Sequence, residues 1–282
     1  MNTATLDAPP TVRPNAAMTT ATAAVPAAYH GVWARTLLET PEGRDTSTWV
    51  RWLQTGLWHG DLRVPPDAPR DTPEGRAQTQ GFAGTTAITR PDAALPEVCT
   101  WQRTIDFQPP RSTPDAGHMV FETPARVVET GIHGRYLEVW ERLPGSLGRR
   151  IALARLDADG QPTAERLLVA GVYCMHLRPR VAAWPADLVP GETLGDLIRR
   201  HPTQAGALLD FEIAFGKKEH GVWTLERATQ PALEGQALPC ALQRVDAARA
   251  RVDRGPLAGG WQVLEWVDDT RNEAIAEMHE RP

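Results

Sequence analysis

The sequence predicts an all-β protein made of two tandem antiparallel β-barrels, with one short helix and a disordered N-terminal leader. Short runs of alternating apolar and polar residues are separated by turn residues, and Pro and Gly number 25 and 23 in a chain of 282. Apolar residues have helical spacing in one short segment only, so there is no βαβ alternation. About fourteen strands exceed the eight to ten of one small barrel, which indicates two barrels.

Most of the predicted strands show period-two alternation and lie between turn residues. In the first half they cover 31–39, 48–54, 57–64, 81–88, 101–107, 118–122, 126–130 and 136–142. In the second half they cover 150–156, 165–177, 211–215, 222–227, 238–245 and 261–267. The segment 157–160, Asp-Ala-Asp-Gly, predicts a hairpin turn, because Asp and Gly accept the positive φ that such turns need. The helix is expected at 193–200, where Leu194, Leu197 and Ile198 share one face.

These elements divide the chain into a leader, two barrels and a tail. Residues 1–28 are rich in Ala, Thr and Pro and lack the pattern of a secretory signal, which predicts a disordered leader. Gly and Pro gather at 144–148, so the first barrel is expected at 29–146 and the second at 147–268. A polar tail follows at 269–282.

Composition excludes several classes of function. The net charge of −5 argues against a protein that binds nucleic-acid backbone, which needs a basic surface. No stretch approaches the roughly 20 apolar residues of a membrane-spanning helix. Three scattered cysteines suggest a reducing compartment, and we expect a soluble cytoplasmic protein. No His or Cys cluster has metal-ligand spacing, so no metal site is predicted.

The clearest local motif is Gly-x-Trp. It opens the first strand as Gly31-Val-Trp33 and recurs as Gly221-Val-Trp223, each time after a His. On a first strand this motif is similar to the lipocalin signature, in which the Trp plugs the closed end of the barrel. Arg142 is the candidate to pack over that ring, a contact worth roughly 0.5–2 kcal/mol.

Two segments are dense in chemically active residues. In the hairpin 48–63, Arg51 and Trp52 lie on opposite faces of the first arm, and His59, Asp61 and Arg63 share one face of the second. That face forms a polar pocket if it points into the barrel, but a solvent-exposed face is the favoured interpretation.

The second such segment is 129–141. Tyr136, Glu138 and Trp140 share a strand face, and a carboxyl group among aromatic rings would have a raised pKa suited to a general acid. The favoured alternative is a Glu–Arg ladder on the surface, with Arg135 or Arg142 as partner.

No cofactor is predicted, but a haem alternative stays open because a single axial His leaves no spacing signature. The candidates are His59, His118, His133 and His176, and each is more often a structural or exposed residue.

The order of several short motifs resembles the HRI family, which includes a yeast protein that interacts with casein kinase. The motifs are Gly81-Phe-Ala-Gly-Thr85, Trp101, Glu129-Thr-Gly131, Glu138-Val-Trp140, Gly171-Val-Tyr173, Phe215-Gly-Lys217 and the run Gly260–Trp266. The resemblance implies two lipocalin-like β-barrels in tandem and a protein partner. It supplies no catalytic residues.

The leading functional hypothesis is a non-enzymatic protein that binds a small, partly apolar ligand in one barrel, with the first barrel favoured. The candidate ligand-binding residues are Arg51, Trp52, Trp58, His59, Trp101, Tyr136, Glu138 and Trp140. One alternative is an isomerase or hydrolase in which His59 or His133 pairs with Glu129, Asp61 or Glu138 inside a barrel. Another is a scaffold that binds a protein partner.

Overall fold

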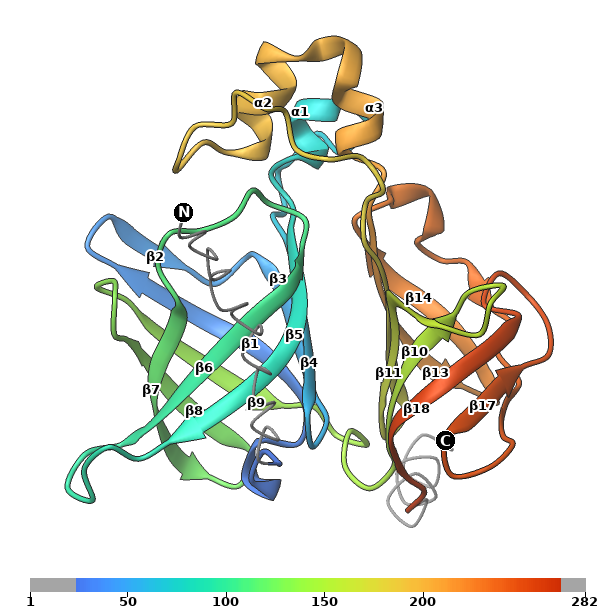
Figure 1. Ribbon diagram of the computed structural model, residues 1–282. Helices are drawn as coiled ribbons and strands as arrows, with labels where there is room; N and C mark the ends of the chain where they lie inside the picture. Colours follow the sequence, from blue (N-terminus) through green and yellow to red (C-terminus); the bar gives the residue numbers. More distant parts are fainter. Residues whose placement is uncertain (1–23, 270–282) are drawn as a thin grey trace, which may run out of the picture.

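The computed structural model describes residues 24–269, which form two nine-stranded antiparallel sheets side by side (Figure 1). Most of the expected leader and tail lies outside the described residues. The all-β fold class is confirmed, with one closed barrel and one curled sheet that stays open.

The first sheet closes on itself. Its order is β2-β1-β3-β4-β5-β6-β7-β8-β9, and an additional pairing of β1 with β9 makes an eight-stranded barrel from which the short β2 projects. The strands are β1 (Gly31–Thr40), β2 (Gly43–Asp45), β3 (Trp49–Gln54), β4 (Trp58–Val64), β5 (Gln80–Thr89), β6 (Glu97–Asp106), β7 (Asp115–Thr123), β8 (Arg126–Gly131) and β9 (Leu137–Arg142). Closure pairs every main strand on both sides, which removes exposed sheet edges.

The second sheet has the order β15-β14-β13-β12-β11-β10-β18-β17-β16 and does not close by strand pairing. Its strands are β10 (Arg150–Leu156), β11 (Pro162–Ala170), β12 (Tyr173–Arg178), β13 (Glu212–Glu219), β14 (Val222–Ala228), β15 (Ala237–Leu238), β16 (Leu242–Arg244), β17 (Arg249–Val252) and β18 (Gly259–Val267). The chain passes from the first sheet to the second between Arg142 and Arg150.

Two strand predictions in the second half are wrong in detail. The run 165–177 is two strands, because Gly171 turns the chain with a φ of +56° between β11 and β12. The run 238–245 contains the end of β15 and the separate strand β16, and β17 was not predicted. The hairpin turn at 157–160 is confirmed: Asp157 N donates to Gln161 O, and Gly160 has a φ of +75°.

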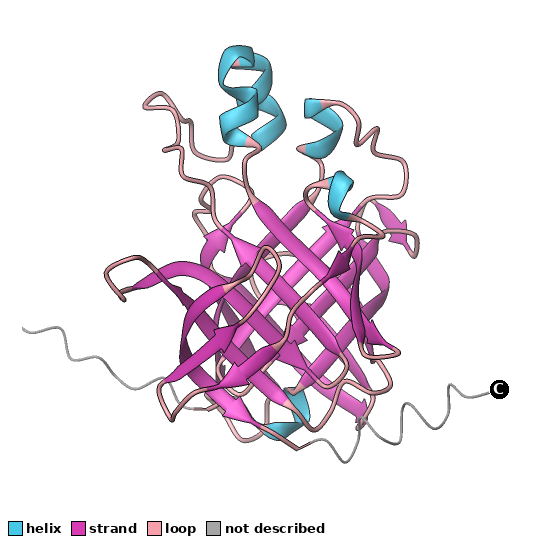
Figure 2. Ribbon diagram, turned by 90° about the vertical axis from the view of Figure 1, so that its right-hand side faces the viewer, coloured by secondary structure: helices cyan, strands magenta, loops and turns pink. Residues whose placement is uncertain are grey.

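Short helices gather at one end of the molecule, above the strands (Figure 2). They are α1 (Pro73–Arg76), α2 (Leu194–Arg200), the 3-10 turn η2 (Pro202–Gln204) and α3 (Ala205–Leu208). The expected helix is α2: Thr193 and Asp196 form its capping box, and Leu194, Leu197 and Ile198 are buried as predicted. Two further 3-10 turns are η1 (Ala27–Tyr29) and η3 (Pro231–Leu233). In residues 24–269, no helix is long and apolar enough to cross a membrane.

The largest core cluster lies where the two sheets meet, not inside either one. Leu53 and Leu62 on the outer face of the barrel pack with Met175, Ile213 and Phe215 of the second sheet. The strands β3, β4 and β5 therefore have two buried faces, one inside the barrel and one against the second sheet.

Candidate functional site

One end of the first barrel is closed as the Gly-x-Trp motif predicts. Gly31 has a φ of +115°, which only glycine adopts easily, and the chain turns there from η1 into β1. Trp33 is fully buried, and its Nε1 donates to Tyr29 O at 2.8 Å. The Arg142 guanidinium lies 4.5 Å from the centroid of that ring and donates to Ala28 O at 2.6 Å. The predicted Trp33–Arg142 contact is confirmed.

The second copy of this arrangement is not at Gly221-Val-Trp223, which only follows the tight turn between β13 and β14. It lies at Gly259-Gly-Trp261, where Gly259 has a φ of +137° and Trp261 Nε1 donates to Leu257 O. The Arg155 guanidinium lies 5.2 Å from the Trp261 ring. Residues 259–261 also match the Gly-x-Trp pattern, so a search of the sequence for every copy of the motif would have found this second site.

The hairpin β3–β4 places its polar face inside the barrel. Trp52 is paired with Asp61 across the two strands and Gln54 with His59, so these residues share the inner face. Asp61 and His59 are buried, and Arg63 follows on the same face. The favoured interpretation of a solvent-exposed His/Asp/Arg face is wrong, because the other face of the hairpin packs against the second sheet.

Arg51 and Trp58 lie on that other face, away from the barrel interior. Arg51 stacks on Trp49, with 4.6 Å from its guanidinium to the ring centroid, and Arg166 of β11 lies 4.5 Å from the Trp58 ring. Both residues contribute to the contact between the sheets. The prediction that Arg51 and Trp58 line a ligand pocket inside the first barrel is therefore corrected.

The other end of the barrel holds a cavity of about 540 Å³. It is lined by five of the candidate residues, namely Trp52, Trp101, Tyr136, Glu138 and Trp140. Trp52 packs edge-on against Trp101 at 5.4 Å and against Trp140 at 5.8 Å. These rings form the apolar floor. The loop 108–113 and residues 191–193, which precede α2, line the mouth.

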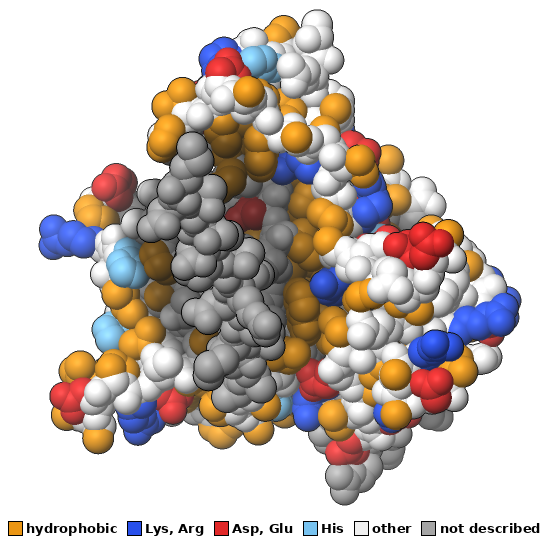
Figure 3. Space-filling view, in the orientation of Figure 1, with side chains coloured by type: hydrophobic (Ala, Val, Ile, Leu, Met, Phe, Trp, Pro, Cys, Tyr) orange, Lys and Arg blue, Asp and Glu red, His pale blue; other side chains and the backbone are white. Residues whose placement is uncertain are grey.

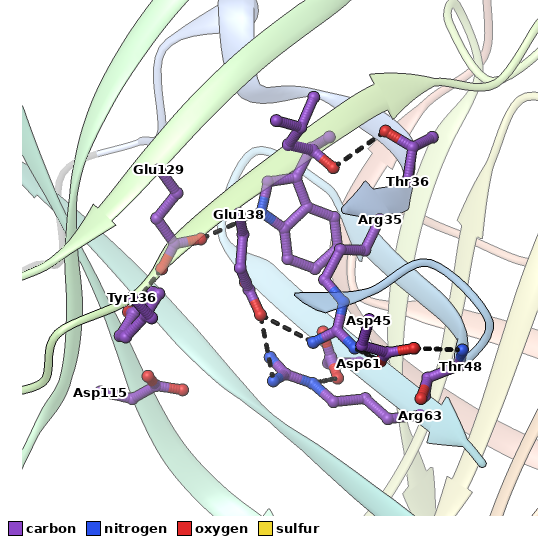
Figure 4. A network of polar contacts seen from close by, with 12 residues as sticks. Arg35, Thr36, Asp45, Thr48, Asp61, Arg63, Asp115, Glu129, Tyr136 and Glu138 are labelled. Atoms are coloured by element: carbon purple, nitrogen blue, oxygen red, sulfur yellow. Dashed lines mark hydrogen bonds and ion pairs between the residues drawn. The ribbon is translucent and has the colours of Figure 1, made fainter. Parts of the chain in front are cut away.

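Charged side chains form a connected network on the wall of this cavity (Figure 4). Glu138 accepts from Arg35 at 2.7 Å and lies 3.8 Å from Arg63, which pairs with Asp61 at 2.7 Å. Arg35 also pairs with Asp45 at 2.9 Å. The surface Glu–Arg ladder favoured for Glu138 is therefore wrong, because Glu138 points into the barrel and is only 4% exposed.

A second part of the network surrounds Arg103. This side chain pairs with Asp115 and, at 3.3 Å, with Asp106, and its guanidinium stacks on Phe82 at 3.3 Å from the centroid. Arg35, Arg103 and Asp115 are not among the site residues predicted from the sequence. Each of the three alternates with apolar residues along its strand, which indicates a face of a strand. Only the register between strands shows that the three faces meet at one cavity.

Glu129 differs from the other carboxyl groups at the cavity. It is 3% exposed, and it accepts from the Tyr136 hydroxyl at 2.7 Å and from Trp140 Nε1 at 3.1 Å. Burial, followed by repulsion from Glu138, raises the pKa of this carboxyl group well above its usual range. A buried, neutral acid therefore lies beside aromatic rings in the cavity wall.

Two glycines make room for this arrangement. A Cβ on Gly117, which lies on the neighbouring strand β7, would come within 2.5 Å of Glu129 Cγ. A Cβ on Gly131 would collide with the Tyr136 ring. The Glu129-Thr-Gly131 sequence therefore supplies both the carboxyl group and the space for its hydroxyl donor.

None of the four candidate haem-binding histidines lines this cavity. His59 lies deeper in the barrel, where its Nδ1 hydrogen-bonds with Thr86 Oγ1 at 3.0 Å, and burial lowers its pKa to about 3. His133 is exposed. His176 lies in the second sheet between Glu165 and Glu212. Among residues 24–269, no hydrogen bond joins His59 or His133 to a carboxylate, so the predicted catalytic pair does not form.

The described part of the chain contains no group of three or more His, Cys, Asp or Glu side chains arranged to hold a metal ion. Charged side chains of both signs are scattered over the visible face of the second sheet without a continuous basic patch (Figure 3).

Comparisons of the chain with protein-family models, with curated proteins and with solved structures gave no match.

Proposed function

We propose that this protein is a non-enzymatic binding protein whose first barrel holds a small, partly apolar molecule. The observation that carries the proposal is the cavity of about 540 Å³ between the tryptophan floor and the charged wall. Ligand sites are typically about 300–1,000 Å³, mostly apolar, with a few polar groups that orient the ligand. The Trp floor and the Glu129–Tyr136 pair fit that description.

The two sheets differ in a way that favours the first. The inside of the second sheet is filled by packed side chains, among them Leu153, Leu225 and Trp261. One cavity beside that cluster measures about 160 Å³, and another of about 530 Å³ is lined by Ala250, Val252 and Gly259. Among residues 24–269, neither Trp nor any other aromatic residue lines that larger cavity, so the tryptophan floor distinguishes the first barrel as the binding site.

Native mass spectrometry of the protein purified from its own host, together with an absorbance spectrum, tests this proposal. We expect a mass adduct that is lost on denaturation. Leu38→Trp narrows the cavity and is expected to abolish the adduct, whereas Glu39→Trp, on the exposed face of the same strand, should retain it. A bare mass for the unmodified protein, or an adduct that survives Leu38→Trp, would contradict binding in this cavity.

Two further proposals accompany this one. Membership in the HRI family, with a protein partner, is supported by the ordered motifs and the two-sheet architecture. A cytoplasmic location is supported by the three cysteines, which are all free thiols.

A further inference from the structure

We propose that the ligand of the first barrel is an organic cation: an ammonium group attached to an apolar or aromatic body. This inference rests on the proposed function and names the chemistry of its ligand. It follows from the balance of charge around the cavity, from the position of Glu129 and from the aromatic walls.

Carboxylates outnumber guanidinium groups at the cavity. Among the residues that line it, Asp61, Asp115, Glu129 and Glu138 stand against Arg63 and Arg103. Arg111 at the mouth adds one positive charge, and Glu192 at the mouth is balanced by Arg200. With the Glu192–Arg200 pair set aside, the lining holds one more carboxyl group than guanidinium groups when Glu129 is counted.

Each of the three network arginines already has a carboxylate partner. An anionic ligand would have to displace Asp61 from Arg63, or Asp115 from Arg103, and leave a buried carboxylate without its counter-ion. A cationic ligand needs no such displacement, since it can pair with a carboxylate that lacks a cation.

Glu129 is that carboxylate. Its hydrogen-bond partners are the neutral donors Tyr136 and Trp140, and within residues 24–269 it makes no ion pair. Figure 4 shows Glu129 beside Tyr136 and Glu138, with Asp115 nearby. An ammonium group here would meet the Glu129 carboxylate on one side.

Aromatic rings supply the remaining contacts. Trp52, Trp101 and Trp140 line the same cavity as Glu129. Cations are attracted to the faces of aromatic rings, most strongly to Trp, and ammonium ligands are commonly held in this way. The same rings provide apolar surface for the body of the ligand.

Isothermal titration calorimetry with three probes of similar size tests the inference. The probes are benzyltrimethylammonium, neutral benzyl alcohol and anionic benzenesulfonate. We expect the cation to bind at least tenfold more tightly than either of the others. Glu129→Gln should weaken binding of the cation by tenfold or more and leave benzyl alcohol unchanged. Glu122→Gln, a matched change at an exposed carboxylate on β7, should leave both unchanged.

The pH dependence of the unmodified protein gives a second measurement that does not require the variant to fold. Glu129 is faced by Glu138, Asp115, Arg63, Tyr136 and Cys99. Burial and repulsion from Glu138 outweigh the attraction of Arg63 and raise the pKa of Glu129, so binding of a permanent cation should release a proton. The affinity for benzyltrimethylammonium should therefore increase as the pH rises from 5 to 8.

The outcomes separate this inference from the proposed function. Tighter binding of benzyl alcohol or benzenesulfonate, abolished by Leu38→Trp, would retain the binding cavity and overturn the cationic ligand. Cation binding that is unaffected by both Glu129→Gln and pH would also overturn it. If none of the probes binds, the cationic ligand is overturned, and the native mass spectrum decides the proposed function separately.

Discussion

The Arg142 guanidinium lies 4.5 Å above the Trp33 ring and joins the last strand of the first barrel to its first strand. It also donates to Ala28 O, so one side chain holds both the ring and the 3-10 turn that covers the closed end. We expect Arg142→Met to reduce the free energy of unfolding by about 1–3 kcal/mol, because a cation–π contact and a hydrogen bond are lost. Urea denaturation measures this change.

Arg126→Met is the matched control. Arg126 makes only exposed ion pairs with Glu122 and Glu141, so its loss should leave the free energy of unfolding nearly unchanged. Equal effects of the two substitutions would show that the Trp33 contact contributes nothing specific.

The raised pKa of Glu129 predicts a loss of stability with rising pH. In the unfolded chain this carboxyl group titrates near 4.5, whereas the folded protein keeps its proton to higher pH. The folded state therefore binds more protons above pH 4.5, and stability decreases by up to about 1.4 kcal/mol per pH unit until the folded pKa is reached.

Glu129→Gln removes this dependence while keeping the side-chain shape. Urea denaturation should show the variant gaining stability relative to the unmodified protein between pH 5 and pH 8. Glu122→Gln, in which an exposed carboxyl group is changed, should follow the unmodified protein. Parallel pH profiles for Glu129→Gln and the unmodified protein would refute the buried neutral acid.

His176 is expected to act as a cation in the second sheet. Its Nε2 lies 2.9 Å from Glu165 and its Nδ1 2.7 Å from Glu212. Burial lowers the pKa of the ring, but the bonds to both carboxylates outweigh burial and raise the pKa above 6.5. The stabilisation is therefore complete below pH 6.5 and is lost as the pH rises through the raised value.

An NMR titration of the His176 ring should show a pKa above 6.5. At pH 6, His176→Gln should cost about 3–5 kcal/mol, because two carboxylates lose their shared counter-ion. His133→Gln serves as the control and should be neutral. A titration of His176 at or below pH 6.5 would contradict the assignment.

Gly117 is predicted to be necessary for the position of Glu129. The Cβ of Gly117→Ala would lie 2.5 Å from Glu129 Cγ, so the acid or the strand must move. We expect a cost of about 1–3 kcal/mol in urea denaturation, as for other overpacked sites. Gly43→Ala, where nothing lies within 4 Å of the added Cβ, should leave stability within about 0.5 kcal/mol. A neutral Gly117→Ala would mean that the cavity wall adapts without strain.

The sequence shows which cavity residues share a face of one strand, but it does not show which strands come together to form the cavity. Tyr136, Glu138 and Trp140 are two residues apart, so period two places them on one face wherever the strand lies. Their association with Trp52 and Trp101 depends on which strands become neighbours. A bulge in β6 changes its register between Arg103 and Ile105. Arg103 and Ile105 therefore lie on opposite faces of the strand, although strict alternation predicts that they share one face.

The sequence by itself determined the β-strands of the first barrel, the helix at Leu194–Arg200 and the closure of one barrel end by Trp33 and Arg142. These features depend on local spacing, on turn residues and on a glycine at positive φ, all of which can be recognised in the linear chain. The inner face of the hairpin β3–β4 was decided only by the tertiary structure. Both faces of the hairpin are buried, one in the barrel interior and one against the second sheet. Hydrophobic alternation therefore cannot show which face points into the barrel. The proximity of Glu129, Glu138 and Arg35 likewise requires the register of β8, β9 and β1, and the last of these pairings joins opposite ends of the barrel sequence.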